Sequence, residues 1–148
     1  MTGNDSLAGV AQRRTALEEA MQLVEREAAA PSGSTDWLGE LGAATRQLEL
    51  AVNHHITHVE ASGSLLDQIV EKAPRLQRSV ENTRTHHAVL AHSISDLLKL
   101  ISEGSAKESA SVAEISTSVI EILNELARHR QDGADLIYEA YAVDIGGY

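Results

Sequence analysis

Apolar residues recur at alternating steps of three and four along four long segments, from about residue 6 to 29, 35 to 61, 74 to 104 and 111 to 141. This spacing places the apolar side chains on one face of an α-helix. The pattern therefore predicts four amphipathic helices. Their apolar positions are Leu7, Val10, Leu17, Met21, Val24 and Ala28; Trp37, Leu41, Ala44, Leu48 and Ala51; Leu76, Val80, Leu90, Ile94, Leu97 and Ile101; and Ile115, Val119, Ile122, Leu126, Leu136 and Ala140.

Helix-breaking and helix-capping residues separate the first two segments. Pro31 and Gly33 interrupt the periodic pattern, and both residues disfavour a helix interior. Ser34 or Thr35 can then cap the second helix, because a hydroxyl oxygen accepts from the free N–H groups of a first turn. We therefore expect the first helix to end near Ala29.

The later boundaries follow from the same kind of signal. The second helix should end near residues 61–64, "ASGS", and a short apolar piece, "LLDQIVEKA", occupies residues 65–73. Pro74 is suited to the first turn of the third helix, and Gly104 should end that helix. A capping-box pattern at residues 111–114 then marks the start of the fourth helix.

Four long helices with mostly short connections favour antiparallel neighbours. We therefore predict an all-α fold, an up-down-up-down antiparallel four-helix bundle with a short extra helical piece between helices two and three. A chain of 148 residues suffices for one core, so we expect a single domain over residues 1–148. The last residues, "AVDIGGY", look frayed or extended and predict a short flexible tail from about residue 142.

Composition and charge narrow the function. Apolar residues make up 43% of the chain, with no Phe and one Trp, which is typical of packed helices. The net charge of −10 argues against nucleic acid or an anionic membrane as partner. The absence of cysteine excludes disulfides and thiolate chemistry. Without a signal-peptide pattern or a bilayer-spanning apolar run, the sequence predicts a cytoplasmic protein.

A polar residue interrupts each apolar stripe: Arg14, His55, His87 and His129. A polar group at a core position needs a partner. Three imidazoles from three helices are a typical metal-binding arrangement, because each ring can offer one lone pair inward and donate its other nitrogen to a second acceptor. The alternative for each histidine is an isolated, hydrogen-bonded core residue.

From about Leu48 to Tyr141 the chain resembles the hemerythrin-like, cation-binding family of four-helix bundles. "LAVNHHITHVEASGSLLDQI" is similar to the family's second helix and the piece after it, "LQRSVENTRTHHAVLAHSISDLL" to its third helix, and "ILNELARHRQDGADLIYEAY" to its fourth. The first helix resembles the family in period and length alone. The resemblance implies a bundle whose core holds iron by histidines and carboxylates.

The family pattern has one His on helix one, His-x3-Glu on helix two, His-x3-His on helix three and His-x4-Asp on helix four. His55, His87 and His129 match the leading residues of these motifs, and their partners are displaced by one position. Val59 stands where the family has Glu, with Glu60 one step further. Ala91 precedes His92 and Ala134 precedes Asp135 in the same way, and Arg14 replaces the helix-one histidine. A local bulge in the helices would compensate for such displacements.

The metal ligands that we predict from this comparison are His55, Glu60, His87, His129, His58 and Asp132. Asp132 shares a helix face with His129, and His58 follows His55 by three residues. His54 and His58, four residues apart, can also chelate a metal on the surface, although such a pair more often faces solvent. His86 and His92 should lie at a stripe edge or in solvent.

The sequence thus leaves competing functions open. The first is a hemerythrin-like metal protein with mononuclear or di-iron chemistry, zinc being the other ion that suits a mononuclear site, which binds or senses a small molecule such as dioxygen, peroxide or nitric oxide. The alternative is a metal-free, degenerate bundle that acts as a ligand-binding or protein-interaction module, with Arg14 paired to an anionic group. A homo-oligomer formed through the apolar piece Leu65 to Val70 is compatible with either function.

Overall fold

The protein forms an all-α bundle in a computed structural model that describes residues 7–32, 36–106 and 112–143. Within these ranges no residue lies in a β-strand. The helices are α1 (Leu7–Ala29), α2 (Trp37–Glu60), α3 (Leu65–Lys72), α4 (Gln77–Ala106) and α5 (Val112–Tyr138), with a 3-10 turn at Pro74–Leu76 and a π-helical turn at Glu139–Val143.

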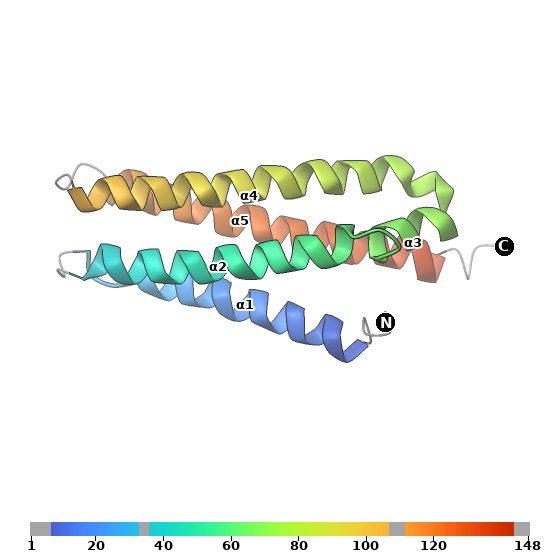
Figure 1. The fold of residues 1–148 in the computed structure, drawn as a ribbon, viewed down its shortest axis with the longest axis horizontal. Coiled ribbons are helices and arrows are strands. Elements are labelled where there is room, and N and C mark those ends of the chain that lie inside the picture. Colours follow the sequence, from blue (N-terminus) through green and yellow to red (C-terminus); the bar gives the residue numbers. More distant parts are fainter. Residues whose placement is uncertain (1–6, 33–35, 107–111, 144–148) are drawn as a thin grey trace.

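The four long helices lie side by side, with α1 packed against α2, α2 against α4, α4 against α5, and α5 against α1 in the least extensive of the four contacts. Figure 1 shows that successive long helices run in opposite directions along the bundle, with α3 at the end where α2 finishes and α4 starts. Towards its first residues, α1 diverges from α2. None of the helices in the described residues is both long and apolar enough to cross a membrane.

The helix boundaries match the sequence signals with small differences. Pro74 begins a 3-10 turn, because a ring without an N–H fits this position, and α4 proper starts at Gln77. That helix extends two residues beyond Gly104, so this glycine does not end it. Asp36 occupies the N-cap position of α2, while the proposed caps at residues 34, 35 and 111 lie outside the described residues.

The C-terminal helical segment ends close to the predicted boundary at about residue 142. α5 passes directly into the π-helical turn, and helical backbone extends to Val143. Ala140 in this turn is fully buried, and Tyr141 packs beside it against the α3 end of the bundle. Residues 144–148 lie outside the described residues. The end of the fourth predicted helix is therefore part of the core.

The core consists of two apolar clusters. The larger cluster runs through the four long helices and contains the buried residues Leu17, Ala20, Val24, Trp37, Leu41, Ala44, Leu48, Val52, Leu90, Ile94, Leu97, Ile101, Ile115, Val119, Ile122 and Leu126. The smaller cluster lies at the α3 end and contains Leu66, Ile69, Ala73, Leu76, Val80, Leu136 and Ala140. Along α4 and α5, His87 and His129 fall between residues of the two clusters, so imidazoles separate them.

The short helix α3 closes the bundle at one end. Leu66 and Ile69 are buried in the smaller cluster, and Leu65 and Val70 pack partly against it. The apolar face of this helix therefore points into the chain. Leu66 and Ile69 are therefore not available to a second copy, and a homo-oligomer that involves Leu65 to Val70 stays a prediction.

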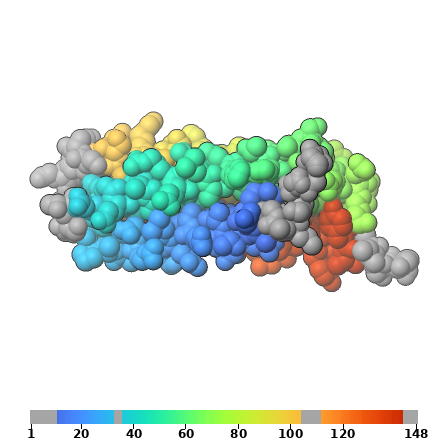
Figure 2. Space-filling view, turned by 60° about the horizontal axis from the view of Figure 1, so that its bottom comes forward, coloured from blue at the N-terminus to red at the C-terminus, as the bar shows by residue number. Residues whose placement is uncertain are grey.

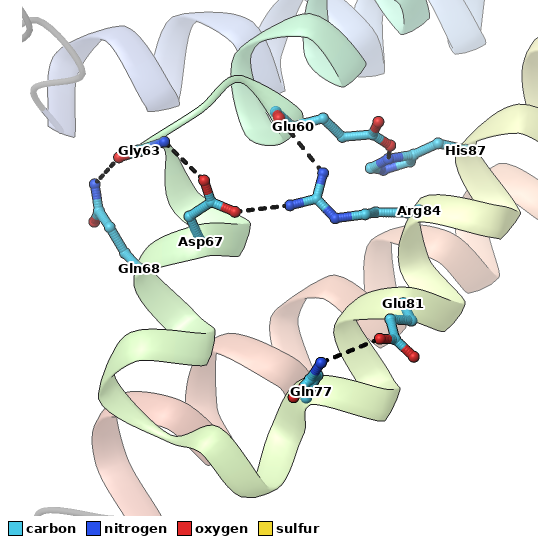
Figure 3. Close-up of polar contacts among 8 residues, drawn as sticks. All are labelled: Glu60, Gly63, Asp67, Gln68, Gln77, Glu81, Arg84 and His87. Atoms are coloured by element: carbon cyan, nitrogen blue, oxygen red, sulfur yellow. Dashed lines mark hydrogen bonds and ion pairs between the residues drawn. The ribbon is translucent and has the colours of Figure 1, made fainter.

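A tight turn joins α2 to α3. Gly63 has φ +78°, which is costly for any residue with a Cβ atom. Its N–H donates to a carboxylate oxygen of Asp67 over 2.8 Å, and its carbonyl accepts from the Gln68 side chain over 3.0 Å. These contacts fix the position of the last residue of α2, Glu60, relative to the helices that follow (Figure 3).

Candidate metal centre

Three histidines from three helices meet inside the bundle. His55 is on α2, His87 on α4 and His129 on α5. The Nε2 atoms of His87 and His129 are 3.2 Å apart, and those of His129 and His55 are 3.4 Å apart. His87 and His129 are buried, and His55 is half-buried. The structure therefore brings together the three histidines that the stripe interruptions predicted.

This geometry fits a single metal ion. One ring nitrogen from each histidine lies within 4.8 Å of the others, which makes the three residues a group able to hold an ion. Zinc binds imidazole nitrogen at about 2.0–2.1 Å in a tetrahedron, whose ligand atoms are then about 3.3–3.4 Å apart. The two measured Nε2 separations are close to that length. Little rearrangement is needed for these two pairs of rings to share an ion.

Glu60 occupies a position behind the metal-facing atoms. One of its carboxylate oxygens contacts Nδ1 of His87, while Nε2 of the same ring faces His129. An ionised carboxylate only accepts hydrogen bonds, so Nδ1 of His87 carries the proton and Nε2 keeps its lone pair. Contacts of this kind fix the tautomer and orientation of a metal-binding histidine. Glu60, which was predicted as a ligand, thus contacts the outer nitrogen of the candidate ligand His87.

Arg84 links the end of α2 to α3 and α4. Its guanidinium donates to the backbone carbonyl of Glu60 over 3.4 Å and forms a 3.0 Å ion pair with Asp67 (Figure 3). Asp67 also accepts from the backbone of Gly63. Arg84 of α4 therefore connects Glu60, which orients His87, to the turn after α2 through Asp67.

All three histidines are held in the neutral form. Burial, together with the neighbouring His87 and Arg13, lowers the pKa of His55 to about 4. Burial and the neighbouring imidazoles lower the pKa of His129 to about 3. The pKa of His87 is also lowered by burial, although its contact with Glu60 opposes this. Neutral imidazole is the form that binds metals.

A cavity of about 560 Å³ lies in front of the three imidazoles. Its wall comes from the early part of α1, the ends of α2 and α5, and α3, with Leu17, Leu66, Ile69 and Leu136 among the apolar side chains. Figure 2 shows α1 (blue) along α2, and the end of α5 (red) at the end of the bundle opposite the end of α1. The volume lies in the range of small-molecule sites.

The other predicted ligands lie away from this centre. Nε2 of His58 is 2.9 Å from Nε2 of His54, one helical turn earlier on α2, so these two histidines form a separate pair near the surface. Asp132 is exposed and does not belong to the group of converging ligand atoms. The structure therefore does not bring His58 or Asp132 to the three-histidine group.

Two further histidines behave as expected from their positions. His86, at the edge of the stripe, contacts Glu125 over 3.1 Å, and its ring lies 5.5 Å from that of His129. His92 is exposed and pairs with Asp96 over 3.3 Å. Each of these side chains has a carboxylate partner outside the group, which leaves both histidines outside the centre.

Arg14 was predicted to lie in the core, and the structure places it at the surface. Its side chain is exposed and lines the outer part of the cavity. Leu17, on the next turn of α1, is buried. The long, flexible arginine side chain keeps its charged group in water while its stem lies along apolar surface. A buried cation beside the histidines is therefore absent at this position.

The sequence pattern did not identify Arg84 and Asp67 as residues that hold Glu60 in place beside the three histidines. Arg84 precedes His87 by three residues, so both lie on neighbouring positions of one helix face. Asp67 lies in the first turn of α3. The spacing on α4 was a usable signal, whereas the contact with Asp67 depends on how the turn folds.

No protein family model, curated protein or solved structure matches the chain. The three-histidine group, its contact with Glu60 and the adjoining cavity are therefore the observations from which a function can be argued.

Proposed function

We propose that the protein binds one transition-metal ion, with iron as the first candidate, through the Nε2 atoms of His55, His87 and His129. A small molecule would reach the ion through the adjoining cavity. The observation that carries this proposal is the convergence of three neutral imidazoles from three helices at metal-ligand spacing. Imidazole suits iron, zinc, copper and nickel alike, and the resemblance to hemerythrin-like proteins favours iron.

The polar surroundings support this proposal. A core histidine with one hydrogen bond needs no further partner, whereas His87 has the Glu60 carboxylate at its outer nitrogen and the His129 imidazole at its inner nitrogen. Nε2 of His55 lies next to the same nitrogen of His129. The pKa of His55 is lowered to about 4 and that of His129 to about 3, so no proton has to be displaced from a charged ring at neutral pH.

One ion is favoured over two. A di-iron centre uses carboxylates that bridge the two ions, and oxygen ligands offset their charge. Here Glu60 contacts the outer nitrogen of His87, and Asp132 is exposed. Three protein nitrogens leave at least one coordination position open, as at metal sites that act on small molecules. Dioxygen, peroxide and nitric oxide are the molecules that the resemblance implies.

The metal-free alternative has one observation in its favour. The Nε2 atoms of His87 and His129 are at hydrogen-bond distance, so these rings can satisfy one another without an ion. In that case the bundle would serve as a ligand-binding or protein-interaction module.

Metal analysis of the purified protein distinguishes these functions. After growth with added iron, and separately with added zinc, elemental analysis should give about one ion per chain, with a visible spectrum for the iron form that changes on addition of nitric oxide. The same protein treated with a chelator and reloaded should recover the ion. Absence of every transition metal after both growth and reloading would refute the metal function.

A further inference from the structure

We infer that the cavity in front of the three histidines binds a small organic anion, a carboxylate with a hydrocarbon body. A diatomic molecule would leave most of its roughly 560 Å³ unused. The inference shares one feature with the proposed function, because the three histidines form the inner wall of the cavity. Recognition of the anion rests on other residues.

The charge of the lining differs in sign from that of the protein. The chain has 22 acidic and 12 basic residues, a net charge of −10. Among the described residues that line the cavity, none is acidic, and three are arginines: Arg13, Arg14 and Arg130. A cationic concavity in an acidic protein attracts anions and excludes cations of similar size.

The arginines differ in how much charge they offer. Arg130 forms a 3.1 Å ion pair with Glu18, so part of its charge is offset. Arg13 is half-buried and contributes to the lowered pKa of His55. Arg14 is exposed at the outer part of the cavity and lies one turn before buried Leu17. Its planar guanidinium can bind a carboxylate with two parallel hydrogen bonds.

The inner surface requires an apolar ligand body. Leu17, Leu66, Ile69 and Leu136 are buried side chains of the lining, and Val59 and Leu65 are half-buried. Neutral His55, His87 and His129 complete this surface. Arg14 and Arg130 are exposed, whereas the four leucine and isoleucine side chains named first are buried. A ligand with its carboxylate outward and its hydrocarbon inward matches this distribution.

Calorimetric titration of octanoate tests this inference, with octan-1-ol as the uncharged analogue and acetate as the anion without a hydrocarbon body. Octanoate should bind the chelator-treated protein at least about tenfold more tightly than either analogue, since charge-assisted hydrogen bonds and apolar burial both contribute. Equal affinity for octanoate and octan-1-ol, or for octanoate and acetate, would overturn it.

Two arginine variants test whether Arg14 binds the carboxylate of octanoate. Arg14→Gln should weaken octanoate about fivefold to tenfold and leave octan-1-ol unchanged. Arg128→Gln removes an exposed arginine of α5 that does not line the cavity, so it should have no effect on either ligand. Equal losses in both variants would show a nonspecific effect of net charge and would contradict the assignment.

Two glycine variants test whether the hydrocarbon chain of octanoate lies in the cavity. Gly133 lines the cavity, and a Cβ atom there meets nothing within 4 Å, so the side chain of Gly133→Leu starts in open space and should occupy part of the cavity. It should weaken octanoate at least about tenfold, since the lost burial involves several methylene groups. Gly39→Leu on α2 has the same open surroundings outside the cavity and is the matched control. Undiminished binding in Gly133→Leu would exclude this site.

The same titrations separate this inference from the metal function. Octanoate selectivity in a protein that takes up no metal would support the anion site and refute the metal centre. Iron uptake by a protein without octanoate selectivity would support the metal centre and refute the anion site. Helical circular dichroism of each variant confirms that it is folded.

Discussion

The carboxylate of Glu60 contacts Nδ1 of His87 across the packing of α2 against α4. This contact leaves the inner nitrogen of His87 free to accept an ion or a proton. Glu60 reaches the outer side of this imidazole because it is the last residue of α2.

Replacement of Glu60 by Gln should therefore weaken metal binding without removing a ligand. Loss of such a support typically reduces metal affinity about 10- to 100-fold. The dissociation constant can be measured by competition with a chromophoric chelator at pH 7.5. Glu49→Gln, on the same helix but outside the centre, is the matched control. Identical constants for the two variants would show that Glu60 does not support the site.

Loss of a proposed ligand should have a larger effect. We expect His87→Ala and His129→Ala to abolish stoichiometric metal binding, because two imidazoles hold an ion much less tightly than three. Helical circular dichroism should persist, since the two apolar clusters remain. His92→Ala removes an exposed histidine and should retain the ion. Full metal content in either core variant would disprove the ligand assignment.

Stability should depend on pH in the metal-free protein. The pKa of His55 is lowered to about 4 and that of His129 to about 3, whereas a histidine in the unfolded chain has a pKa of about 6.5. Between these values the unfolded chain binds protons that the folded protein does not. The free energy of unfolding should therefore be highest above pH 6.5 and fall as the pH decreases towards 4.

Urea unfolding at pH 7.0, 6.0 and 5.0 with a chelator present measures this effect, because ordinary carboxylates titrate mostly below that range. His129→Asn should reduce the slope of unfolding free energy against pH. His92→Asn should leave it unchanged, since this histidine is exposed. A slope in His129→Asn as steep as in the original protein would contradict the role of burial.

Two glycines should respond to alanine in opposite ways. Gly63 has φ +78°, so Gly63→Ala should destabilise the turn by about 1 kcal/mol. Gly39 lies within α2 with open space around it, so Gly39→Ala should stabilise the protein by about 0.5–1 kcal/mol. Chemical unfolding of both variants checks the pair. The same sign in both would contradict the turn geometry.

The periodic apolar pattern was sufficient to predict the all-α bundle, because a repeat close to 3.6 residues leaves few alternatives to a buried helix face. Pro74 marked a boundary correctly to within three residues. Gly104 did not, since a single glycine costs a helix only about 1 kcal/mol and α4 extends two residues beyond it. The inward-facing α3 shows that an apolar piece between helices need not be an exposed interface.

The centre was predictable only in part. His55, His87 and His129 were identifiable because each interrupts an apolar stripe on its own helix. The role of Glu60 depended on the end of α2, where a turn at Gly63 changes the chain direction. Arg14 was misplaced because helix periodicity locates a Cα atom and says nothing of where a long side chain puts its charge.

The division of the core by imidazoles also has a kinetic consequence. The smaller cluster, at the α3 end, is joined to the rest of the core through a polar layer that adds little apolar contact. Regions with fewer buried apolar contacts open more readily than the rest of a protein. Backbone amides of α3 and the adjoining end of α5 should therefore exchange with deuterium faster than those near Leu41 and Ile94. This end of the bundle would then unfold locally while the remaining helices stay folded.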